Sequence, residues 1–420
     1  MTGGSWALAA LLCWHLSVGG AVPKEVPVEQ VRPWALNQKR VRVLILDGAR
    51  SVTLRCSSPA TIVNAENGAR VADTRAGATI TVKSRGGVLV LGVEGHRVDL
   101  RAARVEPSQG GTMALAGRRN AYPGSIEIAA GGGGLRVINT VGIESYLAGV
   151  VAAEMPSTFP LEAMKAQAIA ARTYTLSHLG DHAAEGADLC SQVHCQVYLG
   201  SPPATSRAAR AVQETAGEVL VWNDLLIDAL YHSSCGGATA ASWDVRQGKL
   251  LPYLTGTSDS GPGGEAYCNL DRDSHWSIAF TRAQAERRVA ANLGAVTGRP
   301  GLSPGHLRSL QIENRRGSRV EWLDVGTSSG HYRVRGDAIR WLFGNGNPGP
   351  SGLPSCAFTL SVRKDRHGRP MAFTFKGVGH GHGIGMCQWG ARGRAESGQS
   401  AEEILSAYYP GAEIVDVRHE

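Results

Sequence analysis

The chain has 420 residues, of which 43% are hydrophobic and 19% charged, and its formal net charge is +7. This composition is ordinary for a folded globular protein of two or three domains and argues against a disordered or fibrous chain. The positive charge is not clustered enough to predict nucleic-acid binding, although it is compatible with an acidic partner.

Residues 1–21 are predicted to be a secretory signal. An apolar run, WALAALLCWHLSV, is followed by the small residues Gly19, Gly20 and Ala21, which is typical of a signal peptide cleaved near Ala21. The run has no Lys or Arg in front of it and is too short and too polar for a membrane span. We therefore expect an exported protein. The proline-rich residues 22–40 should form a linker.

Residues 41–121 are predicted to form a small N-terminal β domain. Short Val-rich segments such as VRVLILD, SVTLRC and GVLVLGV alternate with turns that contain Gly, Asn or Asp. No catalytic cluster occurs among them, so binding or spacing is the expected role. A second domain, residues 122–420, should begin with a hairpin around Gly131–Gly134.

The chemistry is expected at the end of the helix that follows this hairpin. An apolar face at helical spacing runs from Leu147 to Glu154, and Pro156 should end the helix near Met155. The partial negative charge of a helix C-terminus and the loss of hydration both disfavour a carboxylate, so Glu154 is predicted to keep its proton, as a general acid must. The alternative is a frayed helix end with Glu154 in water.

A second helix should start after this break, near Pro160, with Glu162 in its first turn. Its many alanines predict close packing of one face. Arg172 and Tyr174 are polar residues of this helix that could face a cleft.

A group of cysteines and histidines near residue 190 is predicted to hold zinc. Cys190 and Cys195 are separated by four residues, with His194 beside the second cysteine and His182 upstream. Thiolates and imidazoles are the ligands that zinc takes, and such cysteine-rich sites are usually structural because they leave no open position. The alternatives are a Cys190–Cys195 disulfide or two free buried thiols. Removal of the signal leaves seven cysteines, an odd number with at least one thiol unpaired or metal-bound.

Two polar clusters occur farther along the chain. The motif YHSS places His232 and Ser234 at a strand end beside a glycine pair, where they could hydrogen-bond sugar groups. A glycine-rich loop with His380 and His382 then leads into a helix that bears Gln388. Glycine allows close approach of a ligand to the backbone, and a helix start offers unpaired amides. A tight structural turn is the alternative role for the loop.

The remaining segments carry no obvious chemistry. Residues 277–360 should form an inserted α+β unit, and Ser400 with Glu403 form a capping box for a final helix. Cys235 could pair with Cys268.

The segment SYLAGVVAAEMPSTFPLEAMKAQAIAARTY resembles the SpoIID/LytB family, named for the stage II sporulation protein D. Further matching motifs follow in order: CQVYLG, ALYHSSCGG, LPYL, GHGIGMCQWGARGRA and ILSAYYPGA. The resemblance covers about residues 122–415, and several long motifs in the right order are far more specific than one short pattern.

This resemblance implies an α+β catalytic domain that cleaves peptidoglycan between N-acetylmuramic acid and N-acetylglucosamine, giving 1,6-anhydro products, with Glu154 as the catalytic acid. The expected partner is a glycan strand whose stem peptides have been removed, and the chemistry requires no cofactor. Some members of the family hold zinc at similar cysteines. The competing function is a non-catalytic glycan-binding enhancer of a cell-wall amidase. With either function, the resemblance implies an exported protein that is periplasmic or associated with the cell wall.

The motifs are expected to meet in one cleft. Glu154, His232 and His382 should line it. The neighbouring side chains would be Arg172, Tyr174, Ser234 and Gln388.

Overall fold

The computed structural model describes residues 40–118, 120–131, 133–245, 250–344 and 352–418. Its described residues form two compact units. We call residues 40–229 with 413–418 the first unit, and residues 230–412 the second unit. The predicted signal peptide and nearly all of the predicted linker lie outside the described residues. No helix in the described part of the chain is long and apolar enough to cross a bilayer.

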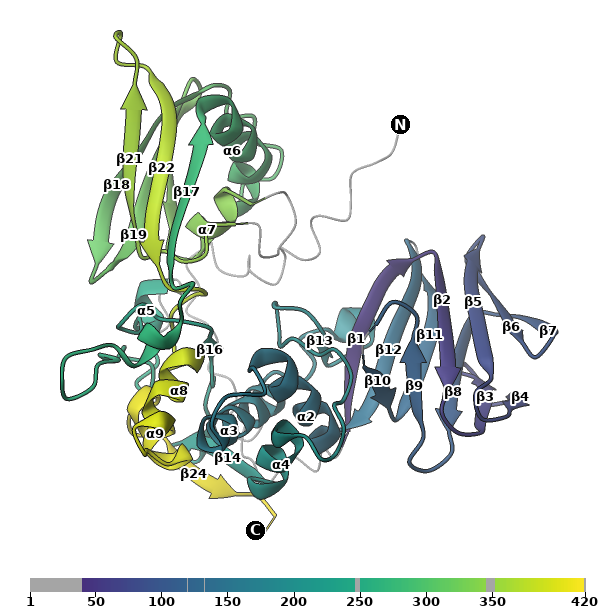
Figure 1. The fold of residues 1–420 in the computed structure, drawn as a ribbon. Coiled ribbons are helices and arrows are strands. Elements are labelled where there is room, and N and C mark those ends of the chain that lie inside the picture. The colour runs from purple at the N-terminus through teal and green to yellow at the C-terminus, as the bar shows by residue number, and fades with distance from the viewer. Residues whose placement is uncertain (1–39, 119, 132, 246–249, 345–351, 419–420) are drawn as a thin grey trace. The chain divides into compact units, whose positions relative to one another are not determined.

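Two β-sheets occupy one part of the first unit (Figure 1). One has the strand order β13 (Leu189–Cys190), β1 (Arg40–Ala49), β12 (Gly134–Gly142), β11 (Ser125–Gly131), β8 (Ala102–Pro107), β3 (Ala60–Asn64) and β4 (Arg70–Thr74). The other has the order β10 (Ala121–Pro123), β9 (Thr112–Leu115), β2 (Ser51–Cys56), β5 (Thr79–Arg85), β6 (Val88–Val93) and β7 (His96–Leu100).

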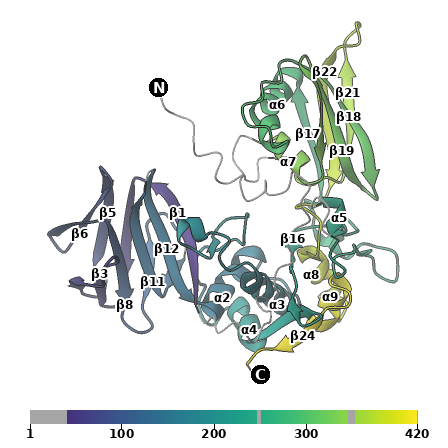
Figure 2. The same cartoon turned by 180° about the vertical axis from the view of Figure 1, so that it is seen from behind.

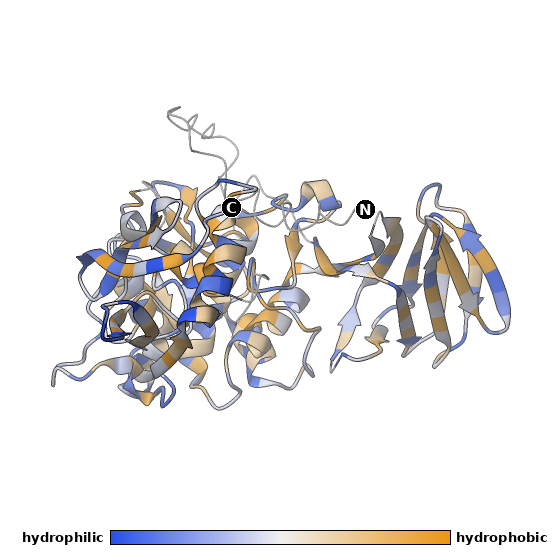
Figure 3. Cartoon of the chain, turned by 90° about the horizontal axis from the view of Figure 1, so that it is seen from above, coloured by the Kyte–Doolittle hydropathy of each residue, from blue (hydrophilic) through white to orange (hydrophobic). Residues whose placement is uncertain are grey.

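These sheets form because apolar and polar residues alternate along the strands, which places one set of side chains on a buried face. In β1, Val41, Val43 and Ile45 are buried and their neighbours are more exposed. The alternation is visible as stripes along the strands in Figure 3.

The boundary expected between residues 121 and 122 falls within strand β10 and divides the first of these sheets between the two expected domains. Strand β1 pairs antiparallel with β12 along most of its length, from Arg40 opposite Gly142 to Ala49 opposite Leu135. The hairpin of β11 and β12, which was predicted around Gly131–Gly134, therefore completes the same sheet as the N-terminal strands.

The first unit also contains a compact group of helices beside a small sheet (Figure 1). The helices are α2 (Ile143–Glu154), α3 (Leu161–Ser177) and α4 (Arg207–Glu214), with a short 3-10 turn, η3 (Ala183–Glu185). The sheet has the order β15 (Leu225–Leu226), β14 (Glu218–Trp222) and β24 (Glu413–Asp416). Helix α3 is buried along most of its length, as its alanine-rich sequence predicts.

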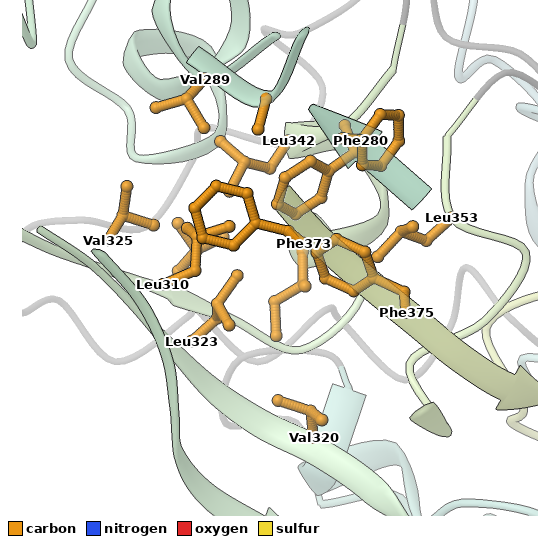
Figure 4. Close-up of a cluster of buried hydrophobic side chains, with 14 of the residues drawn as sticks. Phe280, Val289, Leu310, Val320, Leu323, Val325, Leu342, Leu353, Phe373 and Phe375 are labelled. Carbon is orange, nitrogen blue, oxygen red and sulfur yellow. The ribbon is translucent and has the colours of Figure 1, made fainter. Parts of the chain in front are cut away.

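Half of the second unit is an α+β sandwich around an aromatic core. One sheet has the order β17 (His275–Thr281), β22 (Pro370–Val378) and β21 (Phe358–Lys364), and the other has the order β18 (Leu307–Arg316), β19 (Arg319–Thr327) and β20 (Gly330–Arg335). Helices α6 (Arg282–Val296) and α7 (Ala338–Leu342) pack against the same core. Figure 4 shows Phe280, Phe373 and Phe375 gathered in it.

This sandwich is larger than the inserted unit expected at residues 277–360, because β22 supplies the middle strand of one sheet and ends only at Val378. The remaining elements of the second unit lie together in Figures 1 and 2. They are β16 (Tyr231–His232), which pairs parallel with β23 (Met386–Cys387), and the helices α5 (Ser242–Val245), η4 (Tyr267–Leu270), α8 (Gln388–Glu396) and α9 (Ala401–Tyr408). Ser400 and Glu403 form the predicted capping box of α9. The fold class is α+β, as expected.

Candidate functional site

Glu154 is the last residue of α2, as the following proline predicts. The helix ends at Met155, whose backbone is extended (φ −122°, ψ 135°) and whose N–H donates to the Val151 carbonyl. The Glu154 side chain is half-buried, so it is neither enclosed in the core nor frayed into water. Its Oε1 accepts a hydrogen bond of 2.8 Å from the backbone N–H of Val197.

The donor to Glu154 belongs to a short segment that is fixed on both sides of Val197. The Gln196 amide donates to Thr175 Oγ1 over 2.9 Å, and the Tyr198 hydroxyl donates to Asn139 Oδ1 over 2.9 Å. Gln196 and Tyr198 are both almost fully buried. Because these side chains hold the segment, the Val197 N–H orients the Glu154 carboxyl from a rigid support.

The acidic residues nearest to Glu154 in the flanking sequence are engaged in ion pairs. Glu144 accepts two hydrogen bonds from Arg172, of 2.9 Å and 2.6 Å. Glu162 lies 2.9 Å from the Lys165 ammonium.

Arg172 and Tyr174, which were expected to face a cleft, are both buried. Arg172 is 1% exposed, and in addition to Glu144 it donates to the Glu218 carbonyl over 3.0 Å. A guanidinium with its donors used inside the protein is suited to holding α3 in place, and the substrate contact expected of it does not fit this burial. Tyr174 is buried with its ring stacked on His178, at a centroid distance of 4.0 Å.

The structure brings together the four side chains of the predicted zinc site. The two sulfurs of Cys190 and Cys195 are 3.5 Å apart, and Cys195 Sγ lies 3.3 Å from His182 Nε2 and 3.4 Å from His194 Nδ1. All four ligand atoms lie within 4.8 Å of one another. A tetrahedral zinc ion with Zn–S bonds of about 2.3 Å and Zn–N bonds of about 2.0 Å has ligand–ligand edges of about 3.3–3.7 Å, so the residues fit such an ion.

Two features of this cluster suit metal ligands. His182 Nδ1 lies 3.5 Å from Glu185 Oε2, and a carboxylate on the outer nitrogen orients a ligating imidazole. The pKa of the Cys190 thiol is lowered, first by its hydrogen bond with Cys195 and then by the two histidines. The cluster therefore favours a thiolate at Cys190, which is the form that binds metals.

In the second unit, His232 and His382 lie side by side, with ring centroids 5.5 Å apart. His232 Nδ1 is 3.0 Å from the Ile384 carbonyl, and the Ile384 N–H donates to His382 Nδ1 over 3.1 Å. His382 Nε2 therefore carries the proton and donates to the Tyr231 carbonyl over 2.9 Å. Burial, followed by the charges of His382 and Arg319, holds the pKa of His232 well below its usual range.

Several buried polar atoms in this region have no hydrogen-bond partner among the described residues. They include Nε2 of His232 and Oγ of Ser234, which are the residues expected to bind sugar groups. Nε and Nη1 of Arg319 belong to the same set, while its Nη2 donates to the Cys235 carbonyl over 3.1 Å. Arg319 is the first residue of β19 and lies in the segment for which we predicted no chemistry. The turn before it is rich in arginine, which does not predict a buried side chain.

Glycines of the loop before α8 explain how these side chains approach the backbone so closely. A Cβ on Gly381 would lie 2.8 Å from His232 Cβ, and one on Gly383 would collide with the Arg319 guanidinium. Both glycines have positive φ angles, of 102° and 85°. The glycine-rich motif is thus required by packing. Gln388, the first residue of α8, is also buried, at 5% exposure.

The predicted cleft residues are divided between the two units. Glu154, Arg172 and Tyr174 belong to the first unit, whereas His232, Ser234, His382 and Gln388 belong to the second. A single cleft lined by Glu154, His232 and His382 stays a prediction.

Comparison with known proteins places these residues in a family. A family model described as SpoIID, stage II sporulation protein, matches residues 131–222, which include α2, α3 and the cysteine–histidine cluster. A model for a domain of unknown function (DUF8618) matches residues 268–385, which include the sandwich.

Relatives match over most of the chain. An uncharacterised protein of Brachyspira hyodysenteriae is 30% identical over 302 residues, covering 70% of this chain and 72% of the relative. The stage II sporulation protein D of Bacillus subtilis is 29% identical, covering 66% of this chain and 75% of the relative. The amidase enhancer of Bacillus subtilis is 30% identical over 64% of this chain, but only 40% of its own length is matched. The chain belongs to the SpoIID/LytB family.

Proposed function

We propose that this protein is a lytic transglycosylase that cleaves the glycan strands of peptidoglycan, with Glu154 as acid and base. The observation that supports this proposal is the carboxyl at the end of α2, which the Val197 N–H orients. A positioned carboxyl is what general acid–base catalysis requires.

The proposed reaction uses this carboxyl twice. Glu154 gives its proton to the oxygen between N-acetylmuramic acid and N-acetylglucosamine, and the bond from that oxygen to C1 breaks. The resulting carboxylate takes the proton from the C6 hydroxyl of the same muramic acid, whose oxygen bonds to C1. The products are a 1,6-anhydro end and a free hydroxyl on the N-acetylglucosamine, with no water consumed.

A single carboxyl is sufficient because the sugar's own hydroxyl replaces water. Hydrolytic glycosidases normally use two carboxyl groups on either side of the bond. We propose strands without stem peptides as the substrate, and an exported protein in the periplasm or cell wall as its setting. The reaction requires no cofactor.

We also propose that Cys190, Cys195, His182 and His194 hold a structural zinc ion. When bound, the ion would supply a cross-link between the segment after α3 and the segment that bears Val197. The residues give it four protein ligands, which is a closed site and leaves no position for a substrate.

Product analysis by mass spectrometry tests the enzyme proposal. Denuded glycan strands are incubated with wild-type protein, Glu154→Gln and the control Glu162→Gln, whose carboxylate pairs with Lys165 at the start of α3. The glutamine at 154 can still accept the Val197 hydrogen bond, so the fold should be kept. We expect 1,6-anhydro products from the wild type and the control, and a rate about 10²–10⁴-fold lower with Glu154→Gln. Wild-type cleavage by Glu154→Gln would refute the assignment.

The relative named amidase enhancer supports a second candidate function, in which the protein grips glycan and stimulates a cell-wall amidase. The same variants distinguish the two. An enhancer without catalytic activity would stimulate purified amidase equally well with Glu154→Gln, and no anhydro ends would form with any variant.

A further inference from the structure

The second unit contains another group of metal-ligating side chains, apart from the predicted zinc site. Cys235, Asp259, Cys268 and Cys387 come from four separated segments, and each is at most 1% exposed. Cys235 follows β16, Cys268 lies in η4, and Cys387 ends β23 directly before α8. Their ligand atoms all lie within 4.8 Å of one another.

The distances in this group suit a tetrahedral ion. Cys235 Sγ is 3.6 Å from Cys268 Sγ and 3.2 Å from Asp259 Oδ2. Zinc–sulfur bonds of about 2.3 Å place two thiolates on one zinc ion about 3.7 Å apart, and a carboxylate oxygen slightly closer. Three thiolates and one carboxylate give four ligands, which is the number that a structural zinc site takes.

Backbone amides donate to two of the three sulfurs. The backbone N–H groups of Cys235 and Gly390 each point at Cys387 Sγ over 3.2 Å. The N–H groups of Gly236 and Gly237 point at Cys268. Hydrogen bonds from amides to sulfur favour the charged form, and the start of α8 adds its partial positive charge beside Cys387.

The carboxylate is held in the same manner as a metal ligand. Asp259 Oδ1 accepts a 2.6 Å hydrogen bond from the Tyr408 hydroxyl and a 3.2 Å bond from Arg394 Nε. Its other oxygen, Oδ2, faces Cys235. Outer partners that fix one oxygen and leave the second directed at the site are typical of ligating carboxylates.

A disulfide would explain fewer of these four side chains than a metal ion does. Three neighbouring thiols can form only one disulfide, which leaves the third cysteine and the directed Asp259 oxygen without a role. By contrast, an ion uses all four side chains. We propose that Cys235, Asp259, Cys268 and Cys387 bind a second structural zinc ion, which joins β16, η4 and the start of α8.

Metal analysis of the purified full chain tests this proposal independently of the first cluster. A Cys190→Ser/Cys195→Ser variant removes two ligands of that cluster, so any zinc that remains reports on the second. We expect about one zinc ion per chain in this variant, and none after Cys268→Ala is added. The control Cys356→Ala removes a buried thiol of the same unit, outside the group, and should leave the zinc content unchanged.

Cobalt gives a readout that does not require a cysteine variant of the second group to fold. The Cys190→Ser/Cys195→Ser variant, stripped by chelator and refilled with Co²⁺, should show the intense sulfur-to-cobalt absorption of a tetrahedral site with several thiolates. Asp259→Asn keeps the shape of the site and should weaken Co²⁺ binding at least tenfold. A variant without bound zinc and without this absorption, or a peptide map that joins two of the three cysteines, would overturn the proposal.

Discussion

The burial of Arg172 indicates a role in stability. Its guanidinium is 1% exposed and pairs with Glu144. Removal of one partner from a buried ion pair costs about 3–5 kcal/mol, because the other charge is left without compensation. Since the Glu144 side chain is itself 42% exposed, we expect Glu144→Gln to lower the free energy of unfolding by about 2 kcal/mol.

Denaturant unfolding measures this loss, and the rate of glycan cleavage per folded molecule separates structure from catalysis. If Arg172 acts only in packing, the rate should be unchanged under conditions in which the variant is folded. A decrease in rate without a loss of stability would restore the substrate contact that the sequence predicted for Arg172.

His232 should make stability depend on pH. Its pKa in the folded protein is well below the ordinary value of about 6.5, first because it is buried. The unfolded chain therefore binds the additional proton, so the free energy of unfolding should fall as pH drops below about 6.5, by up to about 1.4 kcal/mol per pH unit.

His232→Asn keeps a donor for the Ile384 carbonyl but does not titrate. Melting temperatures of both proteins between pH 7 and pH 5 should diverge in slope, with the variant less sensitive to acid. Parallel curves would show that His232 does not contribute to the pH dependence.

At the scale of elements, the segment from Cys190 to Tyr198 links the predicted zinc site to Glu154. Cys195 is a proposed ligand, and Val197, two residues later, donates to the Glu154 carboxyl. We expect Cys195→Ser to lower the melting temperature and to reduce cleavage about tenfold or more through misplacement of the carboxyl. Cys56→Ser, at a buried thiol of the first unit outside the cluster, serves as a control.

A chelator should lower the melting temperature of wild-type protein more than that of Cys195→Ser, because zinc bound only to the folded state stabilises it. Equal melting temperatures with and without chelator, together with a Cys190–Cys195 disulfide in a peptide map, would remove the zinc proposal. The chemistry proposed for Glu154 would be unaffected.

The elements predicted correctly from the sequence are those with local signals. Pro156 ended α2 at Glu154, and the hairpin glycines and the Ser400 capping box lay where expected. The pairing of β1 with β12 had no such signal, because register between distant strands depends on the whole sheet. The contacts around Glu154 and Arg172 could not be predicted either. Arg172 pairs with Glu144, which is 28 residues away, and Val197 contacts Glu154 through its backbone N–H, which any residue type could supply.

At the scale of the whole molecule, the predicted cleft requires residues from both units. If His382 contributes to the same site as Glu154, His382→Gln should reduce cleavage about tenfold or more while the protein stays folded, since misplaced site groups cost rate. His367→Gln, in the exposed turn between β21 and β22, is the matched control. Unchanged cleavage by His382→Gln would confine the chemistry to the first unit.

Strand β24 follows the second unit in the chain but belongs to the first unit, which affects how the first unit folds. Strand β24 pairs with β14, so the whole second unit is inserted between two paired strands of the first. The ends of this insertion are held together, because the Tyr409 hydroxyl donates to the Leu230 carbonyl over 2.7 Å. Once the second unit has folded, its two ends lie close together, so it connects β14 to β24 as a short loop would. Closing a short loop costs less entropy than closing a long flexible one. A folded insertion should therefore lower the entropic cost of pairing β24 with β14.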